Sequence, residues 1–235
     1  MDFDKHIHFY VEEEEAKQIL ICVIAISLAF TIVYAGLNAA VKHPKSFLFF
    51  TALSVVTVGS GFILHEMAHK LVAIYYGAYA RFQMWVQGLM IMFITSFFGF
   101  LFAAPGAVYI YSPRITKKEN GLISIVGPIV NIVIALVFLG LENIRPVKFF
   151  FPFFGEPLHV WDFGAKINIV LALFNMLPMF PLDGSKVFVW NKIIWFGFIV
   201  LSLGFGYFVF QSIDIVVMWG ILLLVSLIMS RAFIR

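Results

Sequence analysis

The sequence predicts an all-α polytopic membrane protein, and its composition and its apolar segment lengths support this class. Of the 235 residues, 62% are hydrophobic and 12% are charged, with a mean hydropathy of +0.99. Soluble domains carry about 25% charged residues, so most of this chain is expected in lipid. A helix of about 20 apolar residues spans a bilayer. We expect about six transmembrane helices, in segments 19–41, 47–76, 122–141, 163–180, 187–210 and 213–229.

The first apolar segment, 19–41, is expected to remain in the protein as a membrane anchor. An acidic run, 12–15, precedes it. A cleaved signal peptide instead begins with basic residues and ends at a small-residue cleavage site. Carboxylates are favourable at the positive end of a helix dipole, so the acidic run is expected to begin this helix.

The second apolar segment contains the most informative motif of the chain, His65-Glu66-Met67-Ala68-His69. Residues at i and i+4 share one helix face, so both histidines can address the same ion while Glu66 handles a proton. This is the H-E-x-x-H spacing of zinc metalloproteases. Ionisable groups inside a membrane segment are costly, which indicates a functional site. The structural alternative is a pair of buried histidines that interact with the glutamate.

Asp183 is the candidate third metal ligand, because a catalytic zinc usually has three protein ligands and one open position. It ends the stretch 175–184, where two prolines and a glycine interrupt an apolar helix. Irregular backbone at membrane depth is tolerated only against protein or a wet cavity. The alternative is a solvated aspartate at a helix C-terminus. Together with the histidine pair, the aspartate favours one zinc ion per chain.

These motifs resemble those of the site-2 protease family of intramembrane zinc metalloproteases (peptidase family M50). Residues 65–69 are similar to its H-E-x-x-H, residues 175–184 to its N-x-x-P-x-x-x-L-D-G, and residues 127–131 to the intervening G-P-x-x-N. The resemblance covers roughly residues 47–192. It implies a compact form without PDZ or CBS domains, in which 1–235 is a single membrane-embedded metalloprotease domain.

The resemblance also implies an activity and a set of site residues. Zinc is expected on His65, His69 and Asp183, with Glu66 as the catalytic acid and base. Asn175 is expected to act near the substrate carbonyl. The implied reaction is hydrolysis of peptide bonds in or near transmembrane segments of membrane proteins, as in regulated intramembrane proteolysis.

Segment 84–104 is apolar but is expected not to cross the membrane. The two zinc-binding helices meet through corresponding ends, so an odd number of crossings must separate them, and 122–141 supplies one. We therefore expect a re-entrant or strand-like segment, with Gly88, Gly99 and Pro105-Gly106 at turns. An extended edge there could pair with an unwound substrate by strand addition.

Six crossings place both termini on one side of the membrane. The connections on that side carry more Lys and Arg than those opposite, so the positive-inside rule predicts that the termini and active site face the cytoplasm of a cell-membrane protein. The expected partners are a transmembrane protein substrate and the lipid bilayer. The net charge of +3 forms no basic stripe, which argues against nucleic acid. The sequence does not indicate an oligomeric state.

Two other functions remain open at this stage. A metal-ion transporter would also place His and Asp in the membrane, but it would normally need a chain of polar sites across it. A catalytically inactive relative that binds membrane helices would not need the complete set of Glu66, both histidines and Asp183.

Overall fold

The structure is a computed structural model that describes residues 9–102, 105–112 and 114–233. It is mainly helical, and its strands form two-stranded sheets. The chain divides into two compact units. Unit 1 is Met1–Pro113 with Val147–Val160, and unit 2 is Arg114–Pro146 with Trp161–Arg235.

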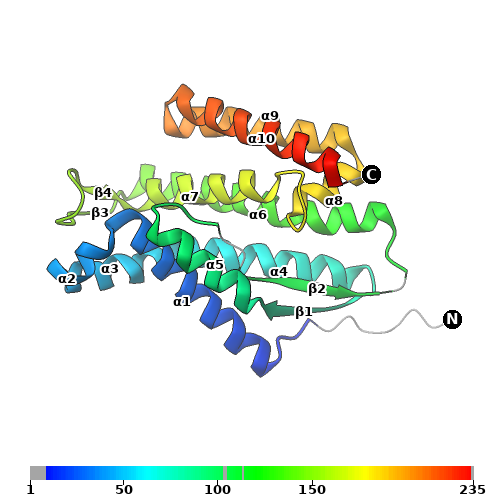
Figure 1. Cartoon of the computed structure of the whole chain (residues 1–235), viewed down its shortest axis with the longest axis horizontal. Coiled ribbons are helices and arrows are strands. Elements are labelled where there is room, and N and C mark those ends of the chain that lie inside the picture. The colour runs from blue at the N-terminus through cyan, green and yellow to red at the C-terminus, as the bar shows by residue number, and fades with distance from the viewer. Residues whose placement is uncertain (1–8, 103–104, 113, 234–235) are drawn as a thin grey trace. The chain divides into compact units, whose positions relative to one another are not determined.

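Unit 1 is built around a long helix that carries the H-E-x-x-H motif (Figure 1). This helix runs from Pro44 to Tyr75 without a break and has a short π-helical section in its middle. The helices of the unit are α1 (Glu13–Ala35), α2 (Leu37–Lys42), α3 (Pro44–Ser54), the π-helix η1 (Val55–Gly59), α4 (Ser60–Tyr75) and α5 (Val86–Phe97). The strands are β1 (Tyr79–Met84), β2 (Gly106–Tyr111), β3 (Lys148–Phe149) and β4 (Leu158–His159).

Helix α1 packs closely on the long helix because Gly59 has no side chain. A Cβ atom at Gly59 would lie 2.8 Å from Val23 Cγ1. Beside this approach, Ile19 and Val23 pack with Phe62 of α4 and Phe82 of β1 in a buried apolar cluster. The helix that carries the motif is thereby held by α1 on one side and by the β1–β2 sheet on another.

Unit 2 consists of helices. They are α6 (Lys117–Ile144), α7 (Val160–Asn175), α8 (Asp183–Trp190), α9 (Lys192–Phe210) and α10 (Ile213–Phe233) (Figure 1). Thr116 caps α6, since its hydroxyl accepts from the Glu119 N–H while the Glu119 side chain accepts from the Thr116 N–H. The core of the unit includes Ile169 and Leu173 of α7 and Trp195 of α9.

The helices confirm the predicted class of all-α membrane protein. Four of them are long and apolar enough to cross a membrane. They are Glu13–Ala35, Pro44–Tyr75, Lys117–Ile144 and Lys192–Phe210, and each overlaps a predicted span. Ile213–Met229 is a shorter apolar helix.

Three predicted spans have different boundaries in the structure. The segment predicted at 19–41 is helix α1, which ends at Ala35, where Gly36 adopts a positive φ of 73°, and residues 37–42 form the separate helix α2. The segment predicted at 163–180 is helix α7, which ends at Asn175 because Pro178 and Pro181 cannot continue it. The segment predicted at 187–210 begins instead at Lys192, because the short helix α8 occupies the preceding residues. Asn191 caps this later start, accepting from the N–H groups of Ile193 and Ile194.

The segment after the H-E-x-x-H helix folds as strand, helix and strand. Strands β1 and β2 are antiparallel, with Tyr79 opposite Tyr111 and Met84 opposite Gly106, and Figure 1 shows them side by side. The chain therefore returns beside the point where it left. The turn expected at Gly88 is wrong, because Gly88 lies inside helix α5, which the sequence did not indicate, whereas Gly99 does adopt a positive φ of 82° after that helix. That 84–104 does not cross the membrane stays a prediction.

Candidate metal centre

The two histidines of the motif lie one helical turn apart on a buried face of α4. His65 is 4% exposed and His69 is 6% exposed. Their Nε2 atoms are 2.9 Å apart, and the rings are nearly perpendicular, with an interplanar angle of 85°. Both nitrogens thus face the same point, as the i, i+4 spacing predicts.

This separation fits a divalent metal. A Zn–N distance of about 2.0–2.1 Å and tetrahedral angles place two ligand nitrogens roughly 3.3 Å apart. The observed 2.9 Å is the length of a hydrogen bond between the two rings, and it is also within a few tenths of an ångström of the value for two zinc ligands. Imidazole nitrogen is a favourable ligand for zinc. Helix α4 therefore presents two of the three protein ligands that a catalytic zinc requires.

Glu66 is buried and bonded to the neighbouring strand. Its Oε2 atom accepts a hydrogen bond of 3.0 Å from the backbone N–H of Val108 in β2. Sequence reasoning did not find this partner, because nothing in a linear pattern joins residues 42 positions apart. The bond fixes the carboxylate at the outer edge of the β1–β2 sheet, beside the two histidines of its own helix.

In unit 2, Asp183 is the first residue of α8 and is 8% exposed. A carboxylate is favourable there because the N-terminus of a helix is its positive end. Its Oδ1 atom lies 3.5 Å from Lys186 Nζ, one turn further along α8. The alternative of a solvated aspartate at a helix C-terminus is wrong, since the residue is buried and begins a helix.

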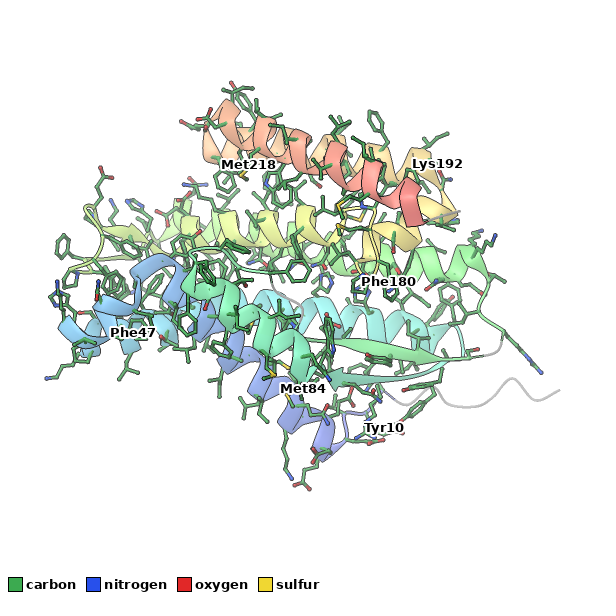
Figure 2. The ribbon with its side chains drawn as sticks, viewed as in Figure 1. Tyr10, Phe47, Met84, Phe180, Lys192 and Met218 are labelled. Atoms are coloured by element: carbon green, nitrogen blue, oxygen red, sulfur yellow. The ribbon has the colours of Figure 1, made fainter. Side chains whose placement is uncertain are left out.

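The turn before Asp183 is held by packing that only glycine permits. A Cβ atom at Gly184 would collide with the backbone carbonyl of Met176. The same carbonyl accepts a hydrogen bond of 2.8 Å from the indole N–H of Trp195. Phe180, at the outside of this turn, is 86% exposed (Figure 2). The close approach of α8 to the end of α7 sets the position of Asp183 within this unit.

Two asparagines of unit 2 have well-defined partners. Asn175, at the end of α7, donates its side-chain amide to the Leu171 carbonyl at 3.0 Å. Asn131, from the G-P-x-x-N match in α6, donates at 3.0 Å to Asn168 Oδ1 of α7. Both Asn131 and Asn168 are fully buried. Sequence reasoning missed Asn168, although a polar side chain in an apolar helix is the usual sign of such a bond.

The chain thus carries a His/His/Asp set that could hold a metal ion. His65, His69 and Asp183 are all buried, and each offers one ligand atom. The donor types, two imidazoles and one carboxylate, are typical of catalytic zinc.

Comparison with known proteins connects this chain to an enzyme class. Several relatives carry the name "Putative zinc metalloprotease". MJ0611 of Methanocaldococcus jannaschii is 41% identical over 189 residues, which are 80% of this chain and 90% of the relative. Synechocystis sll0528 is 31% identical over 133 residues, 57% of this chain and 29% of its own. YwhC of Bacillus subtilis is 28% identical over 153 residues, 57% of this chain and 66% of its own.

No family profile matches the chain, and no solved structure matches it. Its long apolar helices, its H-E-x-x-H helix and these relatives define a membrane-associated zinc metalloprotease. The chain belongs to the zinc metalloprotease family that includes MJ0611. It is a zinc-dependent hydrolase that acts on peptide bonds.

Proposed function

We propose that this protease is an intramembrane endopeptidase, which cleaves peptide bonds in or near transmembrane segments of other membrane proteins. One observation carries the proposal. His65, Glu66 and His69 are buried in a continuous helix, Pro44–Tyr75, that is long and apolar enough to cross a membrane. A protease whose machinery lies in such a helix meets its substrates within the bilayer. The resemblance of the motifs to the site-2 protease family supports the same conclusion.

We assign the zinc ligands as His65, His69 and Asp183. The histidine nitrogens have a spacing that suits zinc. Asp183 supports the assignment because it is a buried carboxylate, and buried carboxylates need a charged partner or a metal.

Zinc, when bound, supplies a Lewis acid that polarises the scissile carbonyl and makes water a stronger acid. Glu66 accepts the proton of the attacking water and later delivers a proton to the departing amine nitrogen. Its bond to the Val108 N–H orients the carboxylate for both transfers. The Asn175 amide has two hydrogens, and while one is directed at Leu171, the second can donate to the oxygen on which charge develops.

The β2 edge is the proposed docking site for an unwound substrate. In an antiparallel pair, alternate residues direct their backbone groups away from the partner strand. Val108 is such a residue, since its N–H bonds to Glu66 instead of to β1. A substrate segment that adds to this edge as a strand therefore arrives beside the catalytic carboxylate. Local unwinding is necessary because a helical peptide bond is shielded by its own hydrogen bonding.

The proposal is tested with the purified protein and a single-span membrane protein in lipid vesicles. Wild type is expected to cleave within the span, and Glu66→Gln is expected to lose roughly 10²- to 10⁴-fold in kcat. In that variant the side-chain amide oxygen can still accept from the Val108 N–H. Because the assigned ligands His65, His69 and Asp183 are also unchanged, zinc per chain should stay the same. Cleavage of water-soluble proteins alone, or full activity in Glu66→Gln, would contradict the proposal. Zinc flux into sealed vesicles without cleavage would identify a transporter instead.

A further inference from the structure

A buried ion pair lies next to the catalytic motif but outside the machinery described above. Lys70 follows His69 in α4, and its Nζ lies 2.7 and 2.5 Å from the two carboxylate oxygens of Glu15 in α1. Glu15 is 0% exposed and Lys70 is 3% exposed. Burying two charges carries a desolvation penalty that the attraction between them often only balances, so the pair is weak evidence for stability alone.

The same carboxylate also holds the neighbouring strand. Glu15 Oε1 accepts a hydrogen bond of 2.8 Å from the backbone N–H of Phe82 in β1. One turn along α1, Gln18 accepts at 2.9 Å from the N–H of Met84, the residue labelled at the end of β1 in Figure 2. Helix α1 therefore supplies side-chain acceptors along the outer edge of β1, and Glu15 joins α1, α4 and β1 at one point.

This point is connected to the catalytic carboxylate through one cross-strand pair. Phe82 of β1 is the register partner of Val108 of β2. Phe82 donates outward to Glu15, and Val108 donates outward to Glu66. Two glutamates thus hold the opposite edges of the same sheet at the same level. A shift of the sheet relative to α4 would move the Val108 N–H away from Glu66.

We propose that Glu15 is a positioning residue for peptide hydrolysis. By binding Lys70 of α4 and Phe82 of β1 together, it fixes the β1–β2 sheet against the catalytic helix and so sets where Glu66 stands on the β2 edge. The inference rests on the proposed function for the role of Glu66 as proton carrier. Glu15 acts through Lys70, Phe82 and Val108 and does not contact the reacting atoms.

The test compares a double variant of the buried Glu15–Lys70 pair with a control variant in an exposed ion pair of the same helix. Glu15→Leu/Lys70→Met removes both charges at similar volume, a change that buried pairs often tolerate. The control is Glu13→Gln, which breaks the exposed Glu13–Lys17 pair of 2.8 Å on the same helix. For each full-length protein we measure zinc per chain and Tm, and we measure kcat and KM with the single-span substrate. Hydrogen exchange of residues 106–111 is measured without substrate.

The double variant is expected to keep its zinc and to have a somewhat lower Tm, because leucine cannot accept from the buried Phe82 N–H. It is expected to lose roughly 10- to 100-fold in kcat, because small misplacements of catalytic groups have effects of this size. Its KM should change by less than about threefold, since the β1–β2 ladder survives. Exchange in 106–111 should accelerate about tenfold or more. Glu13→Gln should match wild type in every measurement.

A double variant that is folded and zinc-loaded, with kcat within about twofold of wild type and unchanged exchange, overturns the proposal. If the double variant does not fold, Glu15→Asp decides. It keeps the charge but withdraws the carboxylate by one methylene, and wild-type kcat and exchange in that variant also overturn the proposal. If wild type cleaves no membrane substrate, the proposed function fails, and the exchange measurement still decides whether Glu15 holds the β2 edge.

Discussion

At the scale of single residues, ionisable groups in apolar surroundings each have a specific partner. The histidines face each other across one turn of α4, Glu66 bonds to Val108, and Glu15 bonds to Lys70. Isolated charges in such surroundings are too costly to persist. Each pairing therefore points to a task, and the two histidines and the glutamate proposed to carry the proton belong to the same short motif, whereas the proposed third ligand, Asp183, lies in α8.

The assignment of Asp183 as the third zinc ligand is tested by removing its carboxylate. Wild type should bind about one zinc per chain. Asp183→Ala should weaken zinc binding by more than the roughly 10- to 100-fold that a change outside the ligands produces, because a ligand itself is lost. Metal content after dialysis against a graded chelator measures this.

The matched control for this measurement is Asp162→Asn. Asp162 also lies in the first turn of a helix of unit 2 and pairs with a lysine, Lys166, at 2.7 Å. It should keep the wild-type zinc affinity. Equal zinc affinity in Asp183→Ala and wild type would show that another residue is the third ligand.

At the scale of elements, the turn between α7 and α8 determines where unit 2 presents its carboxylate. The turn is short because two prolines end α7 and because α8 begins at Asp183 itself. The Met176 carbonyl, bonded to Trp195, leaves room only for a glycine at position 184. The motif spacing alone did not indicate that the aspartate begins a helix.

The importance of this close packing is tested by Gly184→Ala. The added methyl group collides with the Met176 carbonyl, so we expect a loss of about 1–3 kcal/mol in stability, together with weaker zinc binding. Thermal unfolding and metal content measure the two effects.

Gly197→Ala in α9 is the control, because a Cβ atom there meets nothing within 4 Å. That variant should be neutral or stabilised by up to about 1 kcal/mol, as alanine favours a helix. A Gly184→Ala protein as stable as Gly197→Ala would refute the packing argument for the turn.

At the scale of the whole molecule, membrane topology depends on whether segment 84–104 crosses the bilayer. The pairing of Tyr79 with Tyr111 brings the two ends of this region together, and both side chains are about half exposed. Together with the positive-inside rule, this pairing leads us to expect both tyrosines on the same side of the membrane, the cytoplasmic one.

Cysteine labelling tests this arrangement. Tyr79→Cys and Tyr111→Cys, each in intact cells and in inverted vesicles, should react with a membrane-impermeant reagent from the same, cytoplasmic side. The native Cys22 is buried and should stay silent in both preparations, which makes the unsubstituted protein the control. Labelling of the two cysteines from opposite sides would mean that 84–104 crosses, and the predicted topology would be wrong.

The sequence was sufficient where the determining physics is local. Composition and the length of apolar segments established the membrane class, since four long helices lie where spans were predicted. The 3.6-residue period placed His65 and His69 on one face, and the structure confirms it. Prolines at 178 and 181 indicated that a helix stops in this region, although α7 ends at Asn175 and not at the predicted residue 180. Asn175 as an oxyanion donor stays a prediction, since the structure defines only its bond to Leu171.

Only the tertiary structure decided the contacts between residues distant in the chain. The Val108 bond to Glu66, the Glu15 bonds to Lys70 and Phe82, and the Met176 carbonyl over Gly184 all join separate elements. A lysine in an apolar helix, such as Lys70, indicates that the side chain has a partner. The sequence does not identify that partner, because the same helical periodicity is compatible with many different neighbours. Local periodicity therefore placed the two histidines of the proposed zinc site on one helix face, while long-range packing decided how their helix and Glu66 are held.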